Sequence, residues 1–126
     1  MSDEYGKEYE NEYKFGGDKF SAYKNKKVIV CGMGRSGLSS ARLLRRLGAE
    51  VTLQDLKAPE KAKTADLNEM ESLGIELCMG ANPDDIIENY DLVVMSPGIS
   101  AFLPFAERAR ELDIPVIGEI ELAYSL

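Results

Sequence analysis

The stretch Val28-Ile29-Val30-Cys31-Gly32-Met33-Gly34-Arg35-Ser36-Gly37 decides the fold of this chain. It begins with an apolar, mostly β-branched run, which is typical of a strand buried on both faces. It ends with the pattern Gly-x-Gly-x-x-Gly, and a helical pattern follows directly. A strand, a tight turn and a helix in this order predict the first βα unit of a Rossmann-like domain.

Each glycine of this turn has an expected physical role. Gly32 allows the tight turn, Gly34 lets the backbone approach a diphosphate, and Gly37 lets the helix pack close to the sheet. The first N–H groups of the helix, around Arg35 and Ser36, can bind an anion at the positive end of the helix dipole. The motif therefore predicts a phosphate-containing ligand, with a purely structural turn as the alternative.

The rest of the chain alternates strand and helix patterns, which predicts an α/β fold. We expect an open, parallel, five-stranded sheet with helices on both faces and the strand order 3-2-1-4-5. A short helix should open at Asn82-Pro83, and another helix should follow the last strand. The predicted strands are 28–31, 51–54, 75–79, 92–95 and 116–118, and the predicted longer helices are 36–47, 65–73 and 104–112.

Composition excludes several classes of function. The net charge of −7 disfavours nucleic acid and anionic membranes as partners. The sequence has no apolar run long enough for a membrane helix and no signal-peptide pattern, so we expect a cytoplasmic protein. Histidine is absent, and we expect no metal site. Cys31 and Cys78 both lie in apolar runs and are predicted to be buried, reduced thiols.

Residues 1–26 differ from the rest of the chain. This segment is polar and rich in tyrosine, and we expect a solvated, flexible leader before a domain spanning residues 27–126. Tyr5, Tyr9 and Tyr13 recur at helical spacing. A short helix that packs on the domain or on another chain is therefore the alternative.

Two further features point to a site at the carboxyl ends of the strands. Asp55 ends the second strand, where dinucleotide-binding domains place the acid that holds a ribose hydroxyl, although it could also cap a loop. The turn Ser96-Pro97-Gly98-Ile99-Ser100 follows the fourth strand. In the predicted order this turn and the glycine turn flank the switch-point crevice, where open α/β sheets bind ligands. A simple surface turn is the alternative for the second segment.

These turns, together with Gly118-Glu119-Ile120-Glu121-Leu122, give the chain a resemblance to the N-terminal domain of the Mur ligases. The resemblance covers residues 27–126 and is strongest to the branch that adds D-glutamate. It implies a three-domain enzyme of peptidoglycan synthesis whose first domain grips UDP-N-acetylmuramoyl-L-alanine. In that family a central domain binds ATP and magnesium, and a third domain binds the amino acid.

The resemblance also implies which residues meet the ligand. Gly34, Arg35, Ser36 and Gly37 would lie against the diphosphate, and Asp55, Leu56 and Lys57 would surround the uridine. Ser96, Pro97, Gly98 and Ile99 would complete the pocket from the other side. Arg35 replaces an apolar residue of some members, so its guanidinium could meet phosphate or solvent. Lys57 could likewise contact the nucleotide or be a solvated surface lysine.

The sequence assigns no catalytic residue to this chain. It contains no Gly-x-x-x-x-Gly-Lys-Ser/Thr pattern for ATP. We therefore expect a fragment that lacks the central and C-terminal domains, holds no cofactor of its own, and binds the UDP moiety without turnover. The alternatives are an NAD-binding module of the kind that gates potassium transporters and a nicotinamide-dependent dehydrogenase. Binding of UDP rather than NAD would distinguish the Mur ligase domain from these two alternatives.

Overall fold

The computed structural model describes residues 22–97, 99 and 103–124. The tyrosines at positions 5, 9 and 13 and Gly98 lie outside the described residues. The strands are β1 (Lys27–Cys31), β2 (Glu50–Asp55), β3 (Glu76–Met79), β4 (Leu92–Met95) and β5 (Val116–Gly118). The α-helices are α2 (Arg35–Arg46), α3 (Thr64–Ser72), α4 (Pro104–Glu111) and α5 (Glu119–Tyr124). Short 3-10 turns are η1 (Pro59–Lys61), η2 (Pro83–Asp85) and η3 (Ile87–Asn89).

The five strands form one parallel sheet in the order β3-β2-β1-β4-β5. The predicted fold class and strand order are confirmed. Cys31 at the end of β1 pairs with Gln54 of β2 on one side and Met95 of β4 on the other. The carboxyl ends of these three strands therefore meet at one edge, directly beneath the glycine turn and the Ser96 turn.

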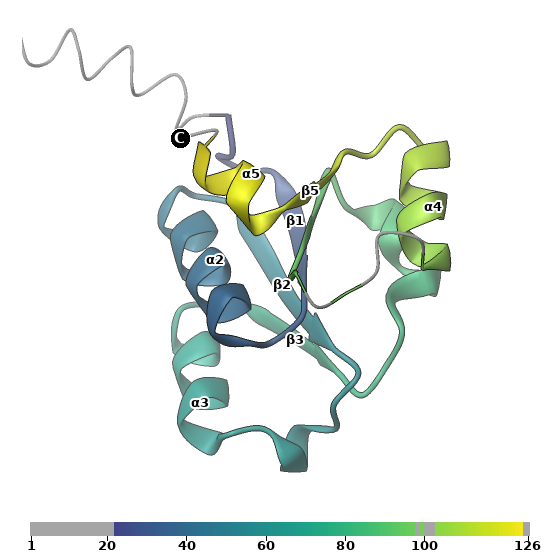
Figure 1. Ribbon diagram of the computed structural model, residues 1–126. Coiled ribbons are helices and arrows are strands. Elements are labelled where there is room, and N and C mark those ends of the chain that lie inside the picture. The colour runs from purple at the N-terminus through teal and green to yellow at the C-terminus, as the bar shows by residue number, and fades with distance from the viewer. Residues whose placement is uncertain (1–21, 98, 100–102, 125–126) are drawn as a thin grey trace, which may run out of the picture.

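Alternation along each strand divides the core between the two faces of the sheet. Val28 and Val30 belong to the cluster beneath α2, α3 and α5, whereas Ile29 and Cys31 belong to the cluster beneath α4 and η3. Figure 1 shows α2 and α3 on one side of the sheet and α4 on the other. Because β1 is buried on both faces, its residues from Val28 to Cys31 are all apolar and do not alternate with polar residues.

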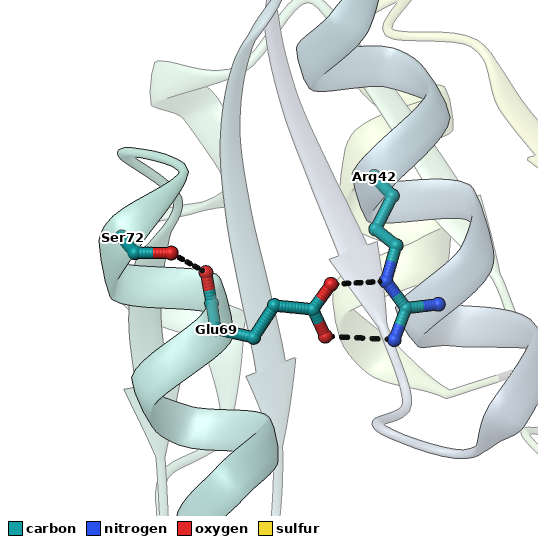
Figure 2. Close-up of polar contacts among 3 residues, drawn as sticks. All are labelled: Arg42, Glu69 and Ser72. Carbon is teal, nitrogen blue, oxygen red and sulfur yellow. Dashed lines mark hydrogen bonds and ion pairs between the residues drawn. The ribbon is translucent and has the colours of Figure 1, made fainter.

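Helix α2 is held to α3 by a two-pronged ion pair. The Arg42 Nε donates to Glu69 Oε2 at 2.7 Å, and its Nη2 donates to Glu69 Oε1 at 2.8 Å. Figure 2 shows this pair, with the Ser72 hydroxyl donating to the Glu69 carbonyl at 2.8 Å. The hydrogen bonds from Arg42 lower the pKa of the Glu69 carboxyl from its ordinary value. This contact fixes the two helices that cover one face of the sheet.

The connection between β3 and β4 contains the predicted short helix in the form of a 3-10 helix. Asn82 occupies the N-cap position of η2 and Pro83 is its first residue, as predicted, and a second 3-10 helix, η3, follows. So short an α-helix is costly to nucleate. The 3-10 turns still bury Ile87, and the Tyr90 hydroxyl donates to Thr52 Oγ1 at 2.9 Å. The buried hydroxyl of Thr52 in β2 thereby has a hydrogen-bond partner in the residue that follows η3.

The two cysteines are free, as predicted, but their environments differ. In the sheet register Gln54 lies between Cys31 and Cys78, which places their Cα atoms roughly 9–10 Å apart, beyond the reach of a disulfide. Cys31 is fully buried, and burial, followed by the nearby Cys78, raises its pKa to about 12. Cys78 is only half-buried because β3 is an edge strand, so the prediction that both are buried is wrong for Cys78.

No helix within the described ranges combines the length and the apolarity needed to cross a lipid bilayer. Over the same ranges, no cluster of acidic, cysteine or histidine side chains is arranged to hold a metal ion.

Candidate functional site

A cavity of ≈ 690 Å³ opens at the carboxyl ends of the strands. It lies between the glycine turn, the end of β2, the segment after β3 and the turn after β4. Its lining combines backbone-rich turns with apolar side chains. The lining residues are Gly32, Met33, Gly34, Arg35, Ser36, Gln54, Asp55, Leu56, Asn82, Pro83, Ser96, Pro97, Ile99, Leu103 and Phe105. A cavity of this size at a switch point suits a nucleotide-sized ligand.

The glycine turn packs so tightly that two of its glycines have no room for a side chain. Gly32 has a φ of +108°, and a Cβ there would lie 2.6 Å from the Ser96 Oγ. A Cβ on Gly37 would collide with the Gly32 carbonyl group. The predicted role of Gly37 in close packing therefore matches the geometry, and the turn after β4 lies directly against the glycine turn.

Gly34, the second glycine of the motif, faces open space and is the N-cap residue of helix α2. A Cβ on Gly34 would meet nothing within 4 Å. No described side chain caps this helix end, and the turn's first helical bond runs from the Leu38 N–H to the Gly34 carbonyl at 2.9 Å. The N–H groups of the first turn therefore have no partner within the helix. They carry the positive end of the helix dipole beside Arg35 and Ser36, which line the cavity.

Asp55 braces the site from the end of β2. Its Oδ2 accepts a hydrogen bond from the Met33 N–H at 2.7 Å, and its Oδ1 accepts one from the Lys57 N–H at 2.8 Å. The carboxylate thus ties the glycine turn to the segment after β2. Each oxygen keeps a further lone pair, so the same carboxylate can still accept a ligand hydroxyl.

The turn after β4 is fixed by bonds from both directions. The Ser96 N–H donates to the Cys31 carbonyl at 3.0 Å, and the Ile99 N–H donates to the Ser96 carbonyl at 3.1 Å. The Ser96 hydroxyl donates to Glu119 Oε2 at 3.0 Å. Because a serine hydroxyl has a single hydrogen, in this geometry Ser96 presents lone pairs, not a donor, to any ligand.

A second depression, of ≈ 420 Å³, adjoins the cavity and is rich in cations. The two share Met33, Gly34 and Arg35. The other residues that line the depression are Leu38, Arg42, Lys57, Lys61, Ala62, Lys63 and Asp66. Although the chain carries a net charge of −7, the surface beside the glycine turn is therefore locally basic. Such a surface attracts an anionic ligand.

The structure brings most of the predicted site residues to the cavity. Those that line it are Gly34, Arg35, Ser36, Asp55, Leu56, Ser96, Pro97 and Ile99. Gly37 is buried beneath the turn instead, and Lys57 lines the basic depression. Sequence reasoning missed Gln54, Asn82, Pro83, Leu103 and Phe105. For Asn82 and Pro83 a signal existed, since they follow β3 closely and strand ends share one edge of the sheet.

Comparison with known proteins identifies a family for this architecture. A family model described as Mur ligase MurD-like, N-terminal domain, matches residues 26–118. The match includes the glycine turn, Asp55 and the turn after β4, which are the parts that enclose the cavity.

Similar proteins are known from several bacteria. UDP-N-acetylmuramoylalanine–D-glutamate ligase of Enterococcus hirae is 44% identical over 108 residues, which is 85% of this chain and 23% of that protein. The ligase of the same name from Lactococcus lactis subsp. lactis (strain IL1403) is 44% identical over 107 residues, covering 84% of this chain and 23% of the relative. The chain thus spans about a quarter of the length of the curated relatives it matches.

A solved structure supports the fold. The pseudomurein peptide ligase type C from Methanothermus fervidus superposes with a TM-score of 0.66 at 24% sequence identity. The superposition covers 78% of this chain and 20% of that one.

Proposed function

Because the chain belongs to the Mur ligase family, as a MurD-like N-terminal domain, we propose that it binds the uridine diphosphate end of UDP-N-acetylmuramoyl-L-alanine. The binding site is the cavity at the carboxyl ends of β1, β2 and β4. The whole protein then serves peptidoglycan synthesis as the ligase that adds D-glutamate to this nucleotide sugar.

One observation carries this proposal: helix α2, whose first N–H groups have no partner within the helix, begins at the wall of a cavity that is also lined by apolar side chains. Arg35 and Ser36 stand at this helix end and line the cavity. The helix dipole and the unpaired N–H groups favour a diphosphate there. Leu56 lines another part of the same cavity, and its exposed side chain offers apolar surface to a base or a sugar.

Several side chains support an anionic ligand at this place. Arg35 lines both the cavity and the basic depression beside it. Lys57, Lys61 and Lys63 add positive charge along the depression. The carboxylate of Asp55 accepts two backbone N–H groups, so it ties the glycine turn to the segment after β2, and it can accept a ribose hydroxyl as well.

The ligation itself needs parts of the protein that these residues do not supply. The resemblance implies that a central domain would hold ATP and magnesium and would supply the phosphoryl group that activates the muramoyl-alanine carboxylate for amide formation with D-glutamate. This sequence contains no P-loop pattern for ATP. We therefore expect the 126-residue chain to bind the nucleotide sugar and to release no ADP when ATP and D-glutamate are added.

Calorimetric titration with UDP-N-acetylmuramoyl-L-alanine and, in parallel, with NAD tests the proposal. Binding of the UDP ligand without binding of NAD is the expected result. Binding of NAD alone would replace the proposal with a nucleotide-sensing module, and absence of binding to either ligand would refute a UDP site in this chain.

The variant Ser36→Asp separates ligand binding from folding. Ser36 is exposed in the first turn of α2. An aspartate there favours the helix dipole, so the melting temperature should stay constant or rise. Its charge faces the cavity, however, so affinity for the UDP ligand should fall at least about tenfold. The matched control is Ser39→Asp, which places the same charge at an exposed position of α2 outside the cavity lining.

A further inference from the structure

The contact between Ser96 and Glu119 has a direction that matters for ligand recognition. The Ser96 Oγ lies 3.0 Å from the Glu119 Oε2, and both residues are partly buried. An ionised carboxylate only accepts hydrogen bonds, so the serine hydroxyl must be the donor. Hydrogen bonds to a charged acceptor are about twice as strong as neutral ones. The hydroxyl hydrogen is therefore committed to Glu119.

Ser96 borders two adjoining hollows, and Glu119 borders one of them. The cavity at the glycine turn and a depression of ≈ 340 Å³ beside β5 share Ser96, Pro97 and Ile99, whereas Glu119 lines the depression and is not part of the cavity lining. Glu119 is linked to the cavity lining by its hydrogen bond with Ser96. The Ser96 side chain is also pressed against Gly32, where any Cβ would lie 2.6 Å from its oxygen.

We propose that Glu119 is a positioning residue that holds Ser96 as a hydrogen-bond acceptor toward the cavity, so that Ser96 binds a hydroxyl or N–H group of the ligand and not a phosphate oxygen. This inference rests on the proposed function. The diphosphate group of the ligand offers only acceptor oxygens, which the lone pairs on Ser96 repel. The ribose, the amino sugar and the uracil all carry O–H or N–H groups that Ser96 can accept.

The cavity then presents hydrogen-bond donors and an acceptor close together, since a Cβ on Gly37 in the first turn of α2 would lie 3.6 Å from the Ser96 Oγ. The start of α2, near Arg35 and Ser36, supplies donors for the diphosphate. The Ser96 hydroxyl oxygen supplies an acceptor for a hydrogen-bearing group. The diphosphate and a hydrogen-bearing group of the same ligand therefore have different partners at the glycine turn.

The neighbouring Glu121 provides a matched control. Its Oε1 accepts the Gly118 N–H at 2.9 Å, so it helps to fix the junction of β5 and α5. It lies on the same short helix and borders the same depression as Glu119, and it is absent from the cavity lining. Glu121→Gln removes the same charge from the same region without touching Ser96.

The experiment titrates the 126-residue chain with two probes, UDP-N-acetylmuramoyl-L-alanine and inorganic pyrophosphate. We expect Ser96→Ala and Glu119→Gln each to weaken binding of the nucleotide sugar about tenfold. The double variant should lose no more than Ser96→Ala alone, because Glu119 acts on the ligand through Ser96. Binding of pyrophosphate should change less than about twofold for either variant, since it uses the start of α2. Glu121→Gln should bind both probes as the unchanged chain does.

Three results would overturn this inference. If Ser96→Ala weakens pyrophosphate binding as much as nucleotide-sugar binding, Ser96 is a phosphate donor. If only Ser96→Ala weakens the nucleotide sugar and Glu119→Gln does not, the serine acts without its glutamate. If both variants melt well below the unchanged chain while their folded fraction binds with unchanged affinity, the contact is structural only. An unchanged chain that binds neither probe refutes the proposed function itself, and the ligand role of Ser96 falls with it.

Discussion

Replacing Gly37 with alanine should destabilise the domain and close its ligand site together. Gly37 is buried in the first turn of α2. A Cβ at this position would lie 3.0 Å from the carbonyl carbon of Gly32 and closer still to its oxygen. The obstacle is backbone, which cannot rotate away as a side chain can. Helix α2 must therefore shift away from the turn.

The free energy of unfolding that Gly37→Ala should remove follows from the core residues that α2 buries. Leu38, Ala41 and Leu44 on this helix are between 0% and 8% exposed, and they pack against β1 and β2. Overpacking of this kind costs typically about 1–3 kcal/mol, and an unyielding carbonyl places the cost near the upper end. For a chain of this length, a loss of ~3 kcal/mol lowers the melting temperature by about 10 °C.

The assay is thermal unfolding followed by circular dichroism, with UDP-ligand titration below the transition. Gly34→Ala is the control from the same turn, because its Cβ meets nothing within 4 Å and its φ of −86° suits alanine. It should cost less than about 1 kcal/mol as a change at a helix N-cap, yet it should still weaken ligand binding, since the methyl group enters the cavity.

A melting temperature for Gly37→Ala within about 2 °C of the unchanged chain would refute this reasoning. It would mean that α2 can move without loss of packing. Equal destabilisation by Gly34→Ala would also contradict it, because the two glycines would then not have separate roles.

Three further predictions concern stability and thiol chemistry. Arg42→Met should lower the melting temperature at pH 7, and the deficit should vanish in strong salt and at low pH. The lowered pKa of Glu69 means that the ion pair stabilises the fold above about pH 4.3 and stops doing so as the pH falls through the folded-state pKa. Burial raises the pKa of Cys31 to about 12, so a thiol reagent at pH 8 should label Cys78 first and Cys31 only on unfolding. Mass spectrometry can follow the labelling of each cysteine, and early labelling of Cys31 would contradict this prediction. Tyr90→Phe should reduce the free energy of urea unfolding by about 0.5–1.5 kcal/mol, and an unchanged midpoint would mean that its hydroxyl bond contributes nothing.

The sequence by itself determined the α/β class, the strand order and most of the cavity lining. The apolar run of β1, the glycine spacing and the helical stripe of α2 are local patterns, and each reflects a short-range rule of backbone geometry or burial. The parallel order then follows from the alternation of elements and the handedness of their crossovers. Gly34, Asp55 and Ser96 could be placed near one another because the carboxyl ends of parallel strands share an edge.

Only the tertiary structure decided what those residues do with their hydrogen bonds. Asp55 is tied to backbone N–H groups on both sides, and Ser96 donates to Glu119, which lies far along the chain. It also brought Leu103 and Phe105 to the cavity and made the short helix at Pro83 a 3-10 helix. A local pattern holds no information on these points, because each depends on which distant groups the folded sheet and its loops bring within hydrogen-bonding distance.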